Sequence, residues 1–294
     1  MYQEALEIYR RLAAANPQAY ESDVAQTLTG LANLYCGNKH FSEAEQMYQE
    51  ALEIYRRLAA ANPQVHEPDV ALTLNNLANL YCITQRFSEA EAMYQEALEI
   101  RRRLAAANPQ TYEPDMAQTL YNLAYLYWET KRFPEAEPMY QKALEIFRRL
   151  AAANPQTYEP VVASTLTGLA ILYKNTQRFT EAEAMYKEAL EIRRRLATAN
   201  PQKYEPDVAD ALYNMAILYS DTKRYPEAEV IYKEALEIYR RLAADNPPAY
   251  EPDVAMTLVN AGMLYLNTER NADAIPQFEE ALEIYRRAAK EYPA

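Results

Sequence analysis

Glycine, cysteine, histidine and tryptophan are all scarce in this chain of 294 residues, which contains four, two, two and one of them. So little glycine leaves few positions for the tight turns that join β-strands, and no glycine-rich loop could cradle a phosphate group. Two cysteines cannot build a disulfide framework, and this favours a reducing compartment. We therefore expect a cytoplasmic protein.

Long apolar runs and clustered positive charge are also missing from the sequence. No apolar stretch approaches the length that spans a bilayer, and the first residues do not form a basic segment followed by an apolar one. The chain has 30 lysines and arginines against 42 aspartates and glutamates, a net charge of −12. Nucleic acids and anionic membranes bind clustered basic residues, so we expect neither as a partner.

The few residues suited to catalysis or metal binding are not grouped. His40 and His66 are expected in loops between helices, with no cysteine or carboxylate at the spacing of a metal ligand. Cys36 and Cys82 occupy equivalent positions of neighbouring repeats, too far apart for a disulfide. We therefore predict no metal site, no cofactor and no enzymatic activity.

The chain consists of one unit of 46 residues repeated along its length. The phrase ALEIYRRLAAANP at 5–17 returns at 51–63 and, with small changes, in every later unit. The predicted divisions are a half repeat at 1–17 and six repeats at 18–63, 64–109, 110–155, 156–201, 202–247 and 248–294. Such a period is typical of a solenoid, in which each unit packs only on its neighbours. We predict one solenoid domain over residues 1–294.

Each unit is expected to form two helices, which in the second unit lie at about 68–84 and 88–107. Pro68 suits the first turn of a helix, where its missing N–H has no partner to lose. Ser88 and Glu91 have the spacing of a capping box, which marks the start of the second helix. The Asn-Pro pair after each second helix stops it, because a residue before proline avoids helical geometry.

The pattern within a unit resembles the tetratricopeptide repeat (TPR). The residues at the family's spacings in the second unit are Leu77, Ala78, Tyr81, Phe87, Ala90, Tyr94 and Ala97. The segments TLNNLANLY at 73–81 and EAEPMYQKALEI at 135–146 resemble the kinesin-light-chain type of this repeat. The resemblance implies an all-α fold, an alpha-alpha superhelix of six helix-turn-helix units after one half-unit helix. It also implies a scaffold for protein–protein interaction.

Comparison of the six first helices separates constant positions from variable ones. The positions of Leu74, Ala78 and Leu80 hardly change, and that of Tyr81 is tyrosine in every copy. We assign these to the packed core. The positions numbered 72, 75, 79 and 82 in the second unit vary freely and share another helix face, so we interpret them as a surface. In the TPR family the first helices line the concave side, which makes this stripe resemble the family's peptide groove.

Aromatic and asparagine side chains mark the candidate groove. Tyr121, Tyr125 and Trp128 are suited to peptide capture, although they could instead pack against neighbouring first helices. The resemblance gives a recurring asparagine the role of holding a peptide backbone; a structural bond to a neighbouring helix is the alternative. Substituting Trp128 or Asn122 should weaken binding and leave stability nearly unchanged. The candidate groove residues are Asn33, Asn76, Asn79, Asn122, Asn214, Asn260, Tyr121, Tyr125, Trp128, Tyr213, Lys174, Ile171, Ile217 and Met263.

The charges of the stripe indicate what kind of partner would bind. Asp210, Asp221 and Glu129 stand against one base, Lys174, so we expect a neutral to mildly basic protein or peptide with apolar or aromatic anchors. Two alternatives remain open. The chain could self-assemble into a homo-oligomer, or it could be an interaction module cut from a larger enzyme or signalling protein.

Overall fold

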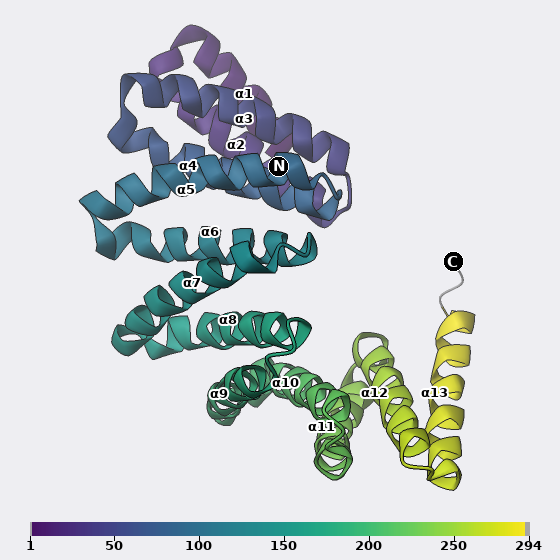
Figure 1. Cartoon of the computed structure of the whole chain (residues 1–294). Helices are drawn as coiled ribbons and strands as arrows, with labels where there is room; N and C mark the ends of the chain where they lie inside the picture. Colours follow the sequence, from purple (N-terminus) through teal and green to yellow (C-terminus); the bar gives the residue numbers. More distant parts are fainter. Residues whose placement is uncertain (1, 292–294) are drawn as a thin grey trace. The chain divides into compact units, whose positions relative to one another are not determined.

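The computed structural model describes residues 2–291, which form thirteen α-helices and no strand (Figure 1). The helices are α1 Tyr2–Ala15, α2 Pro17–Gly37, α3 Phe41–Ala61, α4 Pro63–Ile83, α5 Phe87–Ala107, α6 Pro109–Glu129, α7 Phe133–Ala153, α8 Pro155–Asn175, α9 Phe179–Ala199, α10 Pro201–Asp221, α11 Tyr225–Asp245, α12 Pro247–Asn267 and α13 Asn271–Glu291. The predicted series of helix pairs after a single helix is confirmed.

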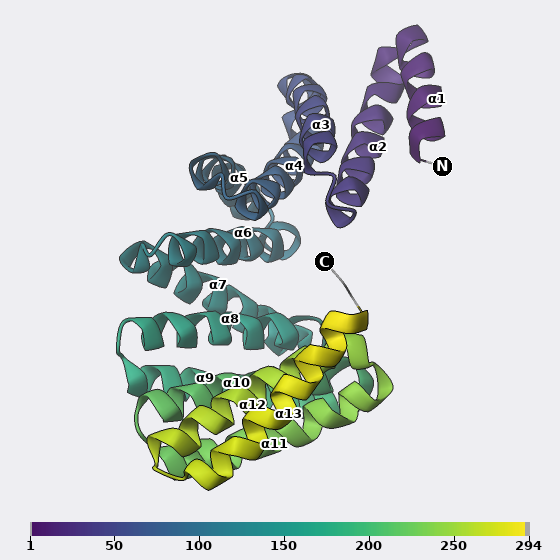
Figure 2. The ribbon, with the colours of Figure 1, turned by 90° about the vertical axis from the view of Figure 1, so that its right-hand side faces the viewer.

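The chain forms two compact units, Met1–Ile146 and Phe147–Ala294, and the division falls within α7. Consecutive helices pack on each other inside each unit, for example α4 on α5 in the first and α12 on α13 in the second (Figures 1 and 2). The even-numbered helices are the first helices of the repeats, and they carry the candidate groove. No described helix is both long enough and apolar enough to cross a membrane.

The first helices begin earlier than predicted. In the second repeat α4 starts at Pro63, and Pro68 lies inside the helix. The prediction of a start at Pro68 was wrong because Pro63 already occupies the first turn, where a proline N–H is not needed. The Asn-Pro pair therefore ends one helix and opens the next with no loop between them. His66 consequently lies within α4 and not in a loop.

The second helices have nearly the predicted bounds, but the predicted capping box is wrong. Ser88 is the second residue of α5, and Arg86 precedes the helix with no side-chain cap. The reason lies in the turn: Gln85 has a left-handed φ of 60°, which reverses the chain so sharply that Phe87 is already helical. The glutamate three residues after Ser88 is then available for another contact.

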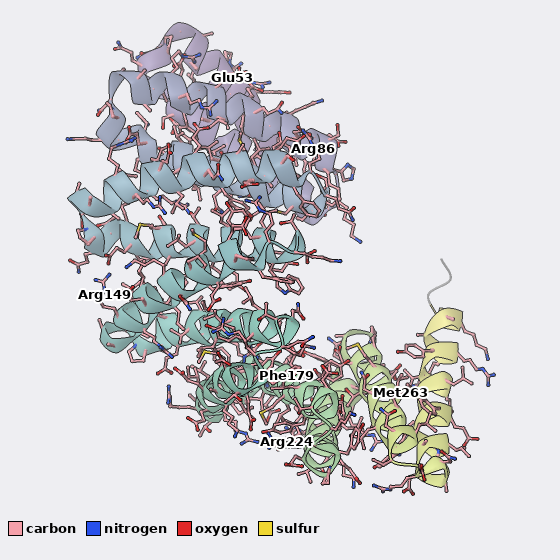
Figure 3. The ribbon with its side chains drawn as sticks, in the orientation of Figure 1. Glu53, Arg86, Arg149, Phe179, Arg224 and Met263 are labelled. Carbon is pink, nitrogen blue, oxygen red and sulfur yellow. The ribbon has the colours of Figure 1, made fainter. Side chains whose placement is uncertain are left out.

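A tyrosine, an arginine and a glutamate join consecutive repeats. The guanidinium of Arg86 lies 4.1 Å from the centroid of the Tyr81 ring and donates to Glu45 of α3 at 2.8 Å. The Tyr81 hydroxyl donates to the same carboxylate at 3.0 Å. The trio recurs as Tyr127, Arg132 and Glu91, as Tyr219, Arg224 and Glu183, and as Tyr265, Arg270 and Glu229. Figure 3 labels Arg86 and Arg224, which follow the ends of α4 and α10.

The constant positions of the first helices lie in the core, as predicted. Leu74 and Ala78 are fully buried, and Leu80 and Tyr81 are nearly so. Because these side chains pack against the partner helix and the neighbouring repeat, any change of volume would disturb several contacts at once. This packing explains why they do not vary between repeats while the adjacent face does.

Candidate functional site

Two aromatic side chains form the accessible part of the candidate groove on α6. Tyr125 is 44% exposed, and its ring centroid lies 5.7 Å from that of Trp128, with an angle of 34° between the planes. The Tyr125 hydroxyl donates to Glu129 at 2.8 Å, and burial together with this bond raises the pKa of Tyr125 to about 12. The indole N–H of Trp128 is buried and has no acceptor within residues 2–291. The pair thus combines an exposed ring with an unused donor.

Tyr121 has a different environment from the other two aromatic residues. Its ring meets the Tyr140 ring edge to face, with centroids 5.6 Å apart and planes at 72°. Tyr140 is buried in α7, so Tyr121 packs against the second helix of its own repeat. Tyr121 therefore packs within its own repeat and not on a neighbouring first helix, while Tyr125 and Trp128 form the open end of the stripe.

A hollow of about 230 Å³ lies beside Tyr125, between the end of α4, the start of α5 and α6. Its lining residues are Cys82, Ile83, Gln85, Phe87, Tyr125, Leu126 and Glu129. Ile83 is 59% exposed, which is unusual for a large apolar side chain next to a cavity. A concave, mainly apolar site with a carboxylate at its rim is suited to receive one apolar side chain of a partner.

Asn122 makes the structural bonds that the alternative interpretation required. Its side-chain N–H groups lie 3.3 Å from the oxygen of Asn75 and 3.4 Å from that of Asn79, both on α4. Its own oxygen accepts from Gln118 at 2.9 Å. Since Asn75 is buried, this amide network links α4 to α6. A role of Asn122 in peptide binding stays a prediction.

The other asparagines use less of their bonding capacity. Asn214 donates to the backbone carbonyl of Asp210 at 2.9 Å, a contact within its own helix. Asn260 donates to the hydroxyl of Tyr213 at 2.6 Å, and the Tyr213 ring packs edge to face on Tyr232. In both amides the oxygen accepts no hydrogen bond within the described residues.

Three asparagines of the first unit complete the candidate set. Asn33 is exposed and accepts from the Tyr48 hydroxyl, and Asn79 accepts from that of Tyr94 at 2.5 Å. These buried tyrosines of the second helices thus reach the groove face with their hydroxyl groups. Asn76 is half-buried and forms no hydrogen bond among residues 2–291, so its whole amide is available.

The only base of the stripe lies next to an acid. The ammonium nitrogen of Lys174 is 3.6 Å from a carboxylate oxygen of Asp221. Asp210 accepts from the Tyr239 hydroxyl at 2.5 Å, and Glu129 accepts from Tyr125. Neither of these two carboxylates has a basic partner among the described residues, so the stripe has an excess of negative charge.

The apolar candidates in the second unit differ in accessibility. Ile171 and Ile217 are half-buried on α8 and α10. Met263 on α12, labelled in Figure 3, is 48% exposed, and Met256 and Leu266 on the same helix are exposed as well. The face of α12 is therefore the most apolar accessible part of the second unit's stripe.

Sequence comparison of the first helices missed a position on the second helices. Arg101 of α5 is only 4% exposed and donates to the Asp115 backbone carbonyl at 2.9 Å and to the Thr119 hydroxyl. Burial lowers its pKa. The signal was present in the sequence, because ALEIYRRLA becomes ALEIRRRLA in this repeat. The equivalent residue of the preceding repeat is Tyr55.

The aspartates in the second turn of the first helices were also missed. Asp69 lies three residues before Leu72, so it extends the variable stripe by one helical turn. We call the space between α2 and α4, where Tyr55 lies, the first window, and the space between α4 and α6, where Arg101 lies, the second window. The first window contains a cavity, and the second is occupied by the Arg101 guanidinium.

Comparisons with known proteins agree with this architecture. The tetratricopeptide repeat family matches residues 69–149, 115–195, 161–241 and 207–287, and a second profile of the same repeat matches 24–63. No curated protein is similar enough in sequence to count as a relative. The crystal structure of BtubC (BKLC) from P. vanneervenii is 27% identical, with a TM-score of 0.68 over 86% of this chain and 94% of that chain.

Two further solved structures share the fold. A putative kinesin light chain with nearly identical TPR-like repeats from Podosopora anserina is 15% identical, with a TM-score of 0.59 over 77% of this chain and 99% of that one. A signal transduction ATPase with a tetratricopeptide repeat sensor from Pyrococcus horikoshii is 17% identical, with a TM-score of 0.68 over 99% of this chain and 41% of that one. With the family matched over most of its length, the chain belongs to the tetratricopeptide repeat family.

Proposed function

We propose that this protein is an interaction scaffold that binds an extended segment of a partner protein along the first helices of its repeats. The observation that supports this most directly is the pair formed by Tyr125 and Trp128. One ring is exposed, the other has an unused N–H, and an apolar hollow lies beside them. Rigid aromatic side chains beside a pocket are the commonest energetic centres of protein interfaces.

The chemistry of the groove favours a particular kind of segment. An apolar or aromatic side chain of the partner would fill the hollow beside Tyr125 and pack against the exposed Tyr125 ring. The amide of Asn76, on the neighbouring first helix, can both donate to and accept from a peptide unit. The excess of acids in the stripe favours a neutral to mildly basic segment. We assign the chain no catalytic role of its own.

A second candidate function is self-association. The last helix, α13, exposes Ile275, Leu282 and Tyr285 by 45–56%. Apolar side chains grouped on one helix are a typical contact surface between protein chains. A homo-oligomer formed through this face would leave the stripe of the first unit free for a partner, so the two functions are compatible.

Selection of peptides on the intact protein tests the proposed function. Trp128 is the single tryptophan, so its fluorescence reports directly on whether a peptide selected from a displayed random library binds the groove. By isothermal titration, Trp128→Ala should weaken the selected peptide by about 2 kcal/mol, close to 30-fold. Val230→Ala, at an exposed site on α11, is the matched control and should change nothing.

The opposite result is equally informative. If Trp128→Ala lowers the melting temperature sharply and leaves peptide affinity intact, Trp128 is a packing residue and the groove assignment is wrong. Light scattering over a range of concentrations tests self-association separately. A mass that rises with concentration and falls back in Leu282→Glu would place the contact on α13.

A further inference from the structure

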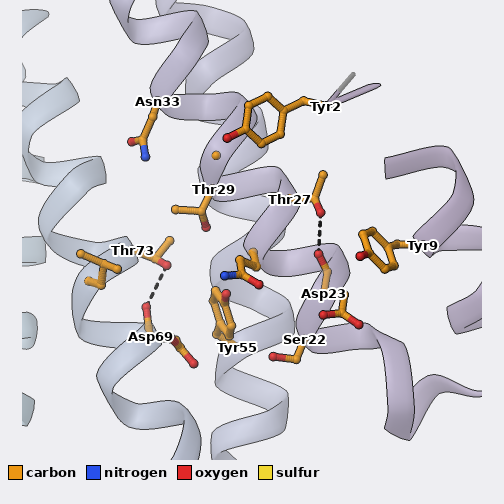
Figure 4. A pocket seen from close by; sticks show the side chains of 13 residues that line it. Tyr2, Tyr9, Ser22, Asp23, Thr27, Thr29, Asn33, Tyr55, Asp69 and Thr73 are labelled. Atoms are coloured by element: carbon orange, nitrogen blue, oxygen red, sulfur yellow. Dashed lines mark hydrogen bonds between the residues drawn. The ribbon is translucent and has the colours of Figure 1, made fainter. Parts of the chain in front are cut away.

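The first window holds a cavity of about 620 Å³ between α2 and α4, bordered by α1 and α3 (Figure 4). Two half-buried carboxylates face it, Asp23 from α2 and Asp69 from α4, and the Tyr55 ring of α3 lies between them in the view of Figure 4. Two tyrosines of α1 also line the cavity: Tyr9 lies beside Asp23, and Tyr2 lies farther away, above Thr29 in the view of Figure 4. The cavity therefore combines two acids with three phenol rings.

Neither carboxylate has a strong partner. The Thr27 and Thr73 hydroxyls donate to backbone carbonyls, those of Asp23 at 2.7 Å and Asp69 at 2.8 Å, and so do not reach the carboxylates (Figure 4). The described residues provide no hydrogen bond or ion pair to the Asp23 carboxylate. The Nδ1 atom of His66 lies 3.6 Å from a carboxylate oxygen of Asp69, longer than a hydrogen bond.

In the second window, the position equivalent to Tyr55 is occupied by an arginine. Arg101 stands 46 residues after Tyr55, and its guanidinium donates to the Asp115 carbonyl and the Thr119 hydroxyl. Asp115 and Thr119 are the equivalents, one repeat later, of Asp69 and Thr73 in the first window. Arginine thus occupies this position as Arg101 and again as Arg193, while the repeat before Arg101 has a tyrosine there and a cavity.

The charges around Tyr55 support the same conclusion. Burial raises the pKa of the Tyr55 hydroxyl, and the negative charges of Asp69 and then Asp23 raise it further. Burial also raises the pKa of the Asp69 carboxyl, partly offset by His66. Burial thus disfavours negative charge at both groups, and a cation bound beside them would offset that penalty.

We propose that the first window is a subsite for an arginine side chain of the partner segment. Its guanidinium would lie between Asp23 and Asp69, above Tyr55. The planar group can donate to two carboxylates at once, and the neighbouring phenol rings attract a cation to their faces. This subsite rests on the proposed function in one respect, since the segment is taken to follow the first helices.

A small probe tests the subsite independently of any selected peptide. N-acetyl-arginine methylamide is titrated into the isotope-labelled intact protein and followed by NMR, with the citrulline and lysine analogues as comparisons. The arginine probe should shift the backbone signals around Asp23 and Asp69 in a saturable way, and the neutral citrulline analogue should not. Equal binding of citrulline, or stronger binding of lysine, would overturn the assignment to a guanidinium, and this comparison needs no variant.

Variants then localise the effect. The double change Asp23→Asn and Asp69→Asn should weaken the arginine probe at least tenfold, while Asp115→Asn, in the window already filled by Arg101, should leave it unchanged. Tyr55→Arg should abolish binding of the probe and preserve the helical content, because the chain would supply its own guanidinium. Unchanged binding in the double variant would refute the subsite. The arginine probe could fail to bind while Trp128→Ala still weakens the selected peptides. That result would refute the subsite alone and leave the proposed function intact.

Discussion

The two windows on either side of α4 have the same backbone plan, and the second helix contributes a different side chain to each. Tyr55 leaves the first window as a cavity with two poorly paired carboxylates. Arg101 fills the second with a guanidinium bonded to the next first helix. The comparison teaches that the second helices, which the groove comparison ignored, decide whether a stretch of the groove wall is open or closed.

In the second window, hydrogen bonds offset the cost of burying the charge of Arg101. A buried charge destabilises a fold unless hydrogen bonds replace its lost water. Arg101 finds a carbonyl and a hydroxyl on α6, and burial lowers its pKa without neutralising it, since arginine keeps its proton in proteins. The open window lacks such an internal cation, which is why we assign it to a partner.

The largest effect on stability is expected from emptying the second window. Arg101→Ala should lower the free energy of unfolding by about 2–4 kcal/mol, because it leaves a cavity and removes two hydrogen bonds to α6. Arg101→Tyr should cost below about 1 kcal/mol, since Tyr55 occupies the same place in the preceding repeat. Urea unfolding followed by Trp128 fluorescence measures both. Equal losses would show that the two windows are not interchangeable.

A smaller effect is expected from cutting the amide network between α4 and α6. Asn122→Ala should cost about 1–2 kcal/mol, because the buried amide of Asn75 loses its partner. Asn214→Ala is the control, since Asn214 bonds only within its own helix, and it should cost below about 0.5 kcal/mol. A loss for Asn214 as large as that for Asn122 would contradict a role of the network in joining the helices. The sequence predicted almost no loss for Asn122, because its position lies outside the constant core positions.

The smallest effect on stability is expected from the ion pair of Glu229 and Arg270, near the C-terminal end of α12. Hydrogen bonding from Arg270 lowers the pKa of Glu229 from its usual 4.5 to about 2. A carboxyl with a lowered folded-state pKa contributes stability above its unfolded pKa and loses that contribution as the pH falls toward 2. The melting temperature of Glu229→Gln should thus fall less between pH 5 and pH 3 than that of the unaltered protein. Glu237→Gln, at an exposed site on α11, should behave like the unaltered protein.

Much of the fold could be predicted because its signals are local and repeated. The helix pairs follow from the spacing of the apolar residues, and the burial of Leu74 and Ala78 follows from their constancy between repeats. The capping box failed because the left-handed Gln85 moved the helix start by one residue, and sequence alone does not show a backbone dihedral angle. The division of the chain within α7 has no counterpart in the regular period.

The sequence by itself determined that this chain repeats, that it is helical, and that Tyr125 and Trp128 stand on a face free of the constant packing positions. Only the tertiary structure decided which polar groups are satisfied. The bond from Arg101 to Thr119 and the bond from Asn122 to Asn75 join residues 18 and 47 positions apart. Local patterns report which face a side chain occupies, but a hydrogen bond depends on ångström-scale distances that arise only when the helices pack.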